Sequence, residues 1–180
     1  MSKIKTFIKK VTPSFVIKIY RTFKEIPKVK MYNAIQDSYV EIVSQVKAKA
    51  RESGKLRVGF YIVFDSSWGS RPVFEKMLTN DFFEPRIVVC PDVARGLTHE
   101  KEVLSKVYRD CCDKYGEKYV ICSYDSKSFS YKDYSDCFDV IFIANPYDTM
   151  TDRVYTVDYL AKKKKKLTVF CDYGYSGKLQ

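Results

Sequence analysis

The chain has 180 residues, 46% of them hydrophobic and 16% aromatic, which is enough for one domain with an appendage but not for two full domains. Its formal net charge at pH 7 is +10, and its six cysteines include no CxxC pair. This cysteine pattern argues against a zinc site and a disulfide framework, so we expect buried free thiols. The sequence shows no signal peptide and no apolar run of the ~20 residues that a membrane span needs, which favours a cytoplasmic protein.

Residues 1–54 are predicted to form a basic amphipathic helical arm. Residues 1–30 hold nine basic residues against Glu25 alone, a net charge of +8. A third periodic stretch reaches Val46, and Gly54 is the expected helix stop. Two earlier apolar stripes recur at helical spacing, formed by Ile4, Phe7, Ile8 and Val11, and then by Phe15, Val16, Ile19, Tyr20, Phe23 and Ile26.

We interpret the arm as a helical segment that lies in the headgroup plane of a membrane with its lysines toward anionic lipid. Each basic residue near such a surface contributes at most about 1 kcal/mol. Two alternatives stay open: the apolar stripe docks on the rest of the protein, or the arm binds nucleic acid. We do not expect nucleic acid, because the segment lacks a recognisable binding module. The residues expected to contact the membrane are Lys3, Lys5, Lys9, Lys10, Lys18, Arg21 and Lys24.

Residues 55–180 are predicted to form an α/β domain with an open, mostly parallel, Rossmann-like sheet of about five strands and flanking helices. Five short apolar runs are typical of strands buried on both faces: 57–64, 86–90, 119–122, 140–144 and 167–171. Helical stretches between them are expected over Pro72 to Leu78, His99 to Tyr115 and Val154 to Lys163. Strands joined by such crossovers run parallel, and ligands of these sheets bind outside the carboxyl ends of the strands.

Several common kinds of site are missing from the sequence. No GxGxxG, GxxxxGK[ST], HExxH, DxD or EF-hand pattern occurs, and we expect no metal site. A phospho-receiver domain is excluded because Asp65 stands alone after the first strand, where that chemistry needs adjacent acidic residues. His99 is the only histidine, and we expect it to be solvated near the start of a helix. The run from Lys162 to Lys166 is interpreted as a solvated helix end, with phosphate or lipid contact as the alternative.

The segments that carry a family resemblance are, in chain order, FYIVFDSSWGSRPVFEKMLTNDFFEPRIVVCPD, DVIFIANPYD and VFCDYGY. In this order they resemble the N-terminal region of bacterial CDP-glycerol glycerophosphotransferase-like proteins, which build teichoic acids and some capsular polysaccharides. The resemblance covers about residues 55–177. It implies a GT-B type transferase with two Rossmann-like domains and no required metal. It also implies a CDP-activated donor and catalytic histidines in a second domain, which these 180 residues do not contain.

We therefore predict the acceptor-side domain of a glycerophosphate or glycosyl transferase that makes a cell-surface polymer, peripheral at the inner face of the plasma membrane. The alternative is a non-catalytic Rossmann-like module that binds a glycan precursor or a partner protein. The expected partners are a lipid-linked polymer acceptor and an anionic membrane surface, and a homo-oligomer is compatible with the sequence. Trp68 and Tyr147 are expected to stack on the acceptor, and no catalytic residue is assigned beyond Asp65 and Asp148 as candidate bases. The candidate acceptor-binding residues are Asp65, Ser66, Trp68, Asn145, Tyr147, Asp148 and Tyr173.

Overall fold

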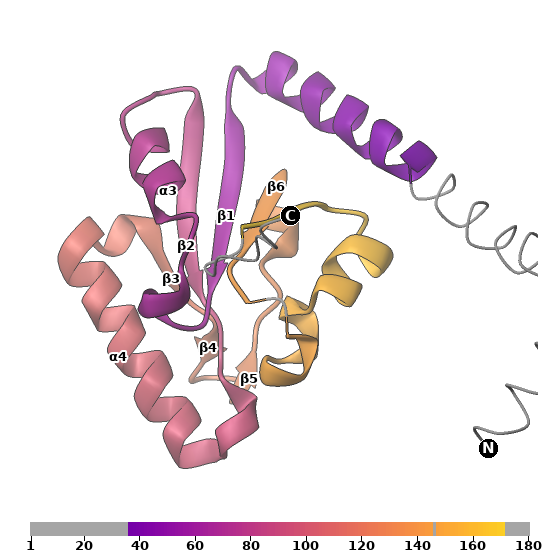
Figure 1. Ribbon diagram of the computed structural model, residues 1–180. Helices are drawn as coiled ribbons and strands as arrows, with labels where there is room; N and C mark the ends of the chain where they lie inside the picture. The colour runs from indigo at the N-terminus through magenta and orange to yellow at the C-terminus, as the bar shows by residue number, and fades with distance from the viewer. Residues whose placement is uncertain (1–35, 146, 172–180) are drawn as a thin grey trace, which may run out of the picture. The chain divides into compact units, whose positions relative to one another are not determined.

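The computed structural model describes residues 36–145 and 147–171, and its centre is a five-stranded parallel sheet with the order β3-β2-β1-β6-β7 (Figure 1). The predicted α/β, Rossmann-like class is confirmed, and each predicted strand is found. The strands of this sheet are β1 (Leu56–Ile62), β2 (Phe83–Val89), β3 (Val120–Cys122), β6 (Val140–Ile143) and β7 (Leu167–Phe170).

The strand order places a topological switch point between β1 and β6. The chain steps outward from β1 to β2 and β3, and then crosses to the other side of β1 to form β6 and β7. Phe60 in the middle of β1 is paired with Ile87 on one side and Phe142 on the other, so its strand is shielded from water within the sheet. Loops diverge at such a switch point, which is where ligands of doubly wound sheets bind.

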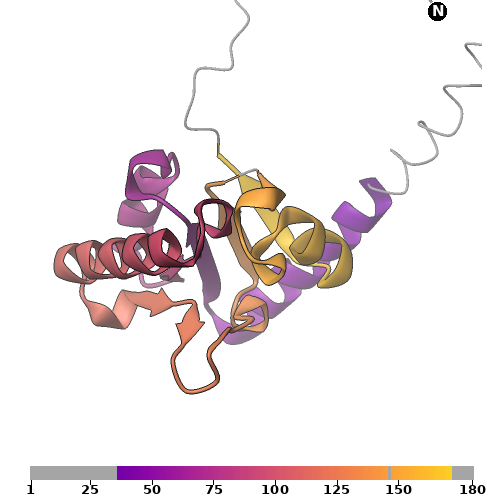
Figure 2. The same cartoon turned by 90° about the horizontal axis from the view of Figure 1, so that it is seen from below.

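Two helices cover one face of the sheet, α3 (Arg71–Met77) and α4 (Leu97–Tyr115) (Figures 1 and 2). Both agree with the predicted helical stretches within two residues. Glycines bound α4, and Gly96 has a φ of +89°, a conformation that side-chain-bearing residues rarely adopt. Gly96 therefore sets the sharp entry into α4, which positions the first turn of the helix beside the end of β2.

The other face is covered by a segment for which the sequence predicts one helix from Val154 to Lys163. The structure instead has a 3₁₀ turn (Arg153–Tyr155) followed by a π-helix (Tyr159–Lys163). Thr156 between them has extended backbone angles, and the Asp148 carboxylate accepts the next two backbone N–H groups. Those two N–H groups bond outside the segment, so a single continuous α-helix does not form.

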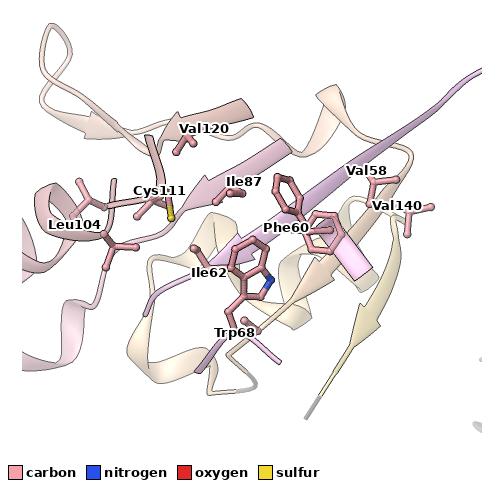
Figure 3. Close-up of a cluster of buried hydrophobic side chains, with 13 residues drawn as sticks. Val58, Phe60, Ile62, Trp68, Ile87, Leu104, Cys111, Val120 and Val140 are labelled. Atoms are coloured by element: carbon pink, nitrogen blue, oxygen red, sulfur yellow. The ribbon is translucent and has the colours of Figure 1, made fainter. Parts of the chain in front are cut away.

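The sheet separates two apolar clusters. One contains the β1 and β2 side chains facing α3 and α4 and includes Trp68 (Figure 3). The other lies under the 3₁₀ and π segment and includes Tyr155 and Leu160. A short hairpin that the sequence did not predict, β4 (Tyr124–Asp125) with β5 (Ser130–Tyr131), follows β3.

A helix over residues 36–53 precedes the sheet and ends at Gly54, whose φ is +68°, as predicted. The compact α/β unit begins at Ile42, and Val46 packs against its core. The expected boundary after residue 54 stays a prediction. The seven lysines and arginines expected to contact a membrane lie outside the described residues.

Among the described residues, no helix is long and apolar enough to cross a membrane. All six cysteines are free, as expected, but only Cys90 and Cys111 are buried. Cys137 is exposed, and the other three are partly buried, so the expectation of buried thiols is wrong for these four.

Candidate functional site

The loops that leave β1, β2 and β6 meet at the carboxyl edge of the sheet. The Arg95 guanidinium, in the loop after β2, lies 5.9 Å from the ring centre of Phe64, which follows β1. The 3₁₀ turn Val93–Arg95 contacts the turn Asp148–Met150, which follows β6. Side chains from three loops are thus brought to one edge, as the parallel topology predicts.

Trp68 belongs to the core and not to an open binding surface. Its indole is only 4% exposed, packs 5.3 Å from the ring centre of Phe74, and donates a hydrogen bond from Nε1 to Ser70 Oγ at 3.0 Å. Figure 3 shows it among the apolar side chains of β1 and β2. The expectation that Trp68 stacks on a ligand is therefore corrected: helix α3 brings its partner Phe74 over the indole and closes it off from solvent.

The two candidate bases are both engaged in holding loops. The Asp65 carboxylate lies 2.5 Å from Arg71 Nη2, which also donates to the Asp65 carbonyl at 2.6 Å. The Asp148 carboxylate accepts the backbone N–H groups of Val157 at 2.7 Å and Asp158 at 3.2 Å. Because both carboxylates have strong donors already, the geometry favours structural roles for them over proton transfer.

Three other predicted residues lie at this edge, and one cannot be placed. Asn145 Oδ1 accepts the backbone N–H of Tyr147 at 3.0 Å, which leaves Nδ2 buried and without a hydrogen-bond partner in the described part of the chain. Tyr147 is 54% exposed, so its ring is open to a ligand, and Ser66 is exposed in the loop after β1. Tyr173 lies outside the described residues.

Asp92, which the sequence did not single out as a site residue, is the most unusual polar group of the edge. Its side chain is completely buried, and Oδ1 accepts the backbone N–H of Ala94 at 3.2 Å. Within the described residues Oδ2 has no hydrogen-bond partner, although Arg95 Nε is 3.6 Å and His99 Nε2 is 3.8 Å away. Leaving a buried polar atom unpaired costs about 1–3 kcal/mol, and more for a charged group.

His99 and Glu100, in the first turn of α4, extend this cluster. His99 Nε2 is buried and also lacks a hydrogen-bond partner among residues 36–145 and 147–171. Glu100 is 5% exposed, and its burial raises the pKa of its carboxyl group. The negative charges of Asp152 and Asp92 raise that pKa further, against a smaller opposite effect of Lys101. The carboxylates of this edge are therefore close enough to repel one another.

Thr151 adds a further unpaired group after β6. It is 8% exposed, and its buried Oγ1 lacks a partner in the part of the chain that the structure describes. The sequence gives one signal for these missed residues: Pro91 and Asp92 directly follow a predicted strand. The depth of Asp92 and the return of His99 toward it depend on the fold of the loop.

A hollow of about 360 Å³ lies at the opposite, amino-terminal end of the sheet. It is rimmed by Lys55, Glu84 and Lys118, and the first two form an exposed ion pair at 3.0 Å. Exposed pairs of this kind are well solvated and impose little on a ligand. We therefore place the candidate site at the carboxyl edge, where the unpaired groups are buried. Among the described residues no group of histidine, cysteine and acidic side chains could hold a metal ion.

No family model, curated protein or solved structure matches the chain. The resemblance to CDP-glycerol glycerophosphotransferase-like proteins therefore stays a prediction, and the geometry of the carboxyl edge is the observation from which a function can be inferred.

Proposed function

We propose that the domain binds the end of a growing cell-surface polymer at the carboxyl edge of its sheet, as the acceptor-side half of a glycerophosphate or glycosyl transferase. The observation that carries the proposal is the set of buried, unpaired polar atoms on loops that meet there. These atoms belong to Asp92, His99, Asn145 and Thr151. Buried polar groups are nearly always hydrogen-bonded in folded proteins, and a ligand with several hydroxyl groups supplies the missing partners.

The exposed ring of Tyr147 supports a carbohydrate or polyol ligand. An aromatic face at the rim of a polar site offers apolar contact to the C–H groups of such a ligand while its hydroxyl groups reach the polar atoms. Tyr147 follows Asn145 closely in the loop after β6, and the Asn145 side-chain oxygen holds the backbone of Tyr147. The same loop thus supplies both a ring and an unpaired amide.

The basic arm supports the membrane part of the proposal. A lipid-linked acceptor remains at the membrane, so an enzyme that extends it benefits from being held there. The net charge of +8 over residues 1–30 is suited to an anionic surface. In this scheme the CDP-activated donor binds a second domain, and the chain described here orients the acceptor.

Titration of the ¹⁵N-labelled 180-residue chain with a glycerol phosphate oligomer that ends in glycerol tests acceptor binding. We expect saturable changes in the amide spectrum in the loops after β1, β2 and β6. Tyr147→Ala should weaken binding about tenfold, whereas Tyr39→Ala, a change at a tyrosine of similar exposure on the helix over 36–53, should not. Changes confined to the amino-terminal hollow, or none, would count against the proposal.

The catalytic part has a separate test. Incorporation of glycerol phosphate from CDP-glycerol into the oligomer identifies a transferase. Retained binding without incorporation favours the non-catalytic module instead.

Cosedimentation with vesicles tests the membrane part. The chain should sediment with anionic vesicles at low salt and release as salt rises, because salt screens the lysines. Removal of residues 1–30 should abolish sedimentation, and vesicles of neutral lipid serve as the control. Equal sedimentation with and without residues 1–30 would overturn this part.

A further inference from the structure

We infer that Asp92 and His99 act as a carboxylate–imidazole pair in which His99 contacts the ligand and Asp92 is the positioning residue. In this pair His99 Nε2–H points to Asp92, and Nδ1 accepts a hydrogen bond from an uncharged hydroxyl group. The inference rests on the function proposed above. It specifies which chemical group of the ligand binds at the carboxyl edge of the sheet.

The two side chains are arranged for such a pair. Asp92 Oδ2 and His99 Nε2 are both buried, and neither has a hydrogen-bond partner within the described residues. They lie 3.8 Å apart, and Arg95 Nε lies 3.6 Å from the same Asp92 oxygen. The distance between Asp92 and His99 is too long for a hydrogen bond, but a movement of about 1 Å would bring it into range. His99 is able to make that movement, because its side chain is 38% exposed while Asp92 is held by Ala94 N–H. Solvent therefore reaches the imidazole from the side away from Nε2.

The backbone explains why the pair is oriented in this way. Asp92 caps the 3₁₀ turn after β2, and Gly96 turns the chain into α4 three residues before His99. A buried carboxylate behind an imidazole fixes which ring nitrogen carries the proton and presents the other nitrogen outward.

Charge favours an uncharged ligand group at this place. Asp152 and Asp92 both raise the pKa of Glu100 in spite of Lys101, and Arg95, with Nε 3.6 Å from Asp92 Oδ2, offsets part of this negative charge. A phosphate brought to this place would meet the repulsion of these carboxylates as well as lose its hydration. A neutral hydroxyl group meets no such cost, and it both donates and accepts hydrogen bonds. The unpaired Asn145 Nδ2 and Thr151 Oγ1 on the facing loop offer a donor and a hydroxyl partner to the same ligand.

The imidazole can be observed directly, because His99 is the only histidine of the chain. With the glycerol-ended oligomer bound, we expect a ring N–H proton that is protected from exchange with water. Asp92→Asn keeps the oxygen that accepts Ala94 N–H but removes the acceptor for Nε2–H, so the protected signal should disappear. Asp110→Asn removes the same charge from an exposed position on α4 and should leave the signal in place.

Affinity measurements by calorimetry test the ligand group. We expect the glycerol-ended oligomer to bind at least tenfold more tightly than one of equal length that ends in a phosphate monoester. His99→Ala should weaken the glycerol-ended oligomer about tenfold. His99→Asn should restore part of the loss, because its amide occupies the place of Nδ1, and a purely structural role for His99 predicts no such rescue.

The outcomes separate this inference from the function it rests on. Binding at the edge without a protected N–H, or with preference for the phosphate end, overturns the Asp92–His99 pair and leaves acceptor binding standing. Absence of binding by either oligomer counts against the proposed function and the inference together.

Discussion

Two buried aspartates lie at opposite ends of the same sheet and differ in how many hydrogen bonds their carboxylates accept. Asp139 precedes β6 at the amino-terminal end, and Asp92 follows β2 at the carboxyl end. Asp139 Oδ2 accepts the backbone N–H of Arg57 at 3.1 Å and its Nε–H at 3.0 Å, and Oδ1 accepts from Nη2 at 2.6 Å. Asp92 has one backbone donor at Oδ1, and its Oδ2 has no hydrogen bond from any described residue and only a longer ion pair with Arg95 at 3.6 Å.

The difference shows that the buried carboxylate at the amino end is fully hydrogen-bonded and the one at the carboxyl end is not. At the amino end, burial alone would raise the pKa of Asp139, but hydrogen bonds from Arg57 outweigh it and lower that pKa overall. At the carboxyl end, burial and neighbouring carboxylates raise the pKa of Glu100. Polar groups that cost stability are typical of functional sites, because a ligand and not the protein supplies their partners.

The largest effect is expected from Trp68→Ala. This variant tests whether the loop after β1 belongs to the buried apolar core. Removal of a buried aromatic side chain costs about 3–5 kcal/mol of unfolding free energy, because a cavity remains. Denaturant unfolding followed by circular dichroism measures this cost, since the variant has no tryptophan left. Tyr147→Ala, at the exposed ring, should change stability by less than about 0.5 kcal/mol. Similar small losses for both variants would show that Trp68 is open to solvent and does not belong to the core.

The next effect is expected from Asp139→Asn, which should cost about 2 kcal/mol at pH 7 because hydrogen bonds between charged groups are lost. The pKa of Asp139 is lowered in the folded protein, so the stability it contributes is complete above its unfolded pKa of about 3.9. That stability is lost as pH falls through the lower, folded pKa. The difference between wild type and variant should therefore shrink below pH 4, as urea unfolding at pH 7 and pH 3 would measure. A difference that stays constant over this range would mean that the charge of Asp139 is not what Arg57 stabilises.

A smaller effect of opposite sign is expected from Glu100→Gln. Since the pKa of Glu100 is raised in the folded protein, ionisation of this group disfavours folding at neutral pH. Removing its charge should therefore stabilise the protein at pH 7 by about 1 kcal/mol, because the cost of burying a charge beside other carboxylates is removed. The gain should fade as pH drops and the wild-type carboxyl group protonates. Thermal unfolding against the control Glu117→Gln, an exposed residue just after α4, measures the gain, and a loss of stability at pH 7 would show that Glu100 is favourably paired.

The sequence predicts the sheet better than it predicts the edge. Apolar runs such as 140–144 are predicted correctly because a short, continuous apolar run between polar segments is typical of a strand buried on both faces. The place of Trp68 depends on the packing of α3 against β1, which no local pattern records. The sequence points to Asp148 instead of Asp92 for the same reason. The Asp148 carboxylate accepts backbone N–H groups nine and ten residues later, and no local pattern predicts these contacts. The sequence favours a solvated His99 because the nearness of this residue to Asp92 requires the turn at Gly96.

The smallest stability effect is expected from Asp92→Asn, although Asp92 is the more deeply buried of the two aspartates. The asparagine keeps an oxygen for Ala94 N–H, and the charge that it removes has no hydrogen bond at Oδ2 from any described residue. The lost attraction to Arg95 and the relieved cost of burying a charge offset each other, so we expect a change within about 0.5 kcal/mol. Urea unfolding of this variant beside Asp139→Asn measures both ends of the sheet under one condition. If Asp92→Asn costs as much as Asp139→Asn, the Asp92 carboxylate is already satisfied in the folded protein, and the carboxyl edge offers a ligand nothing that the amino edge does not.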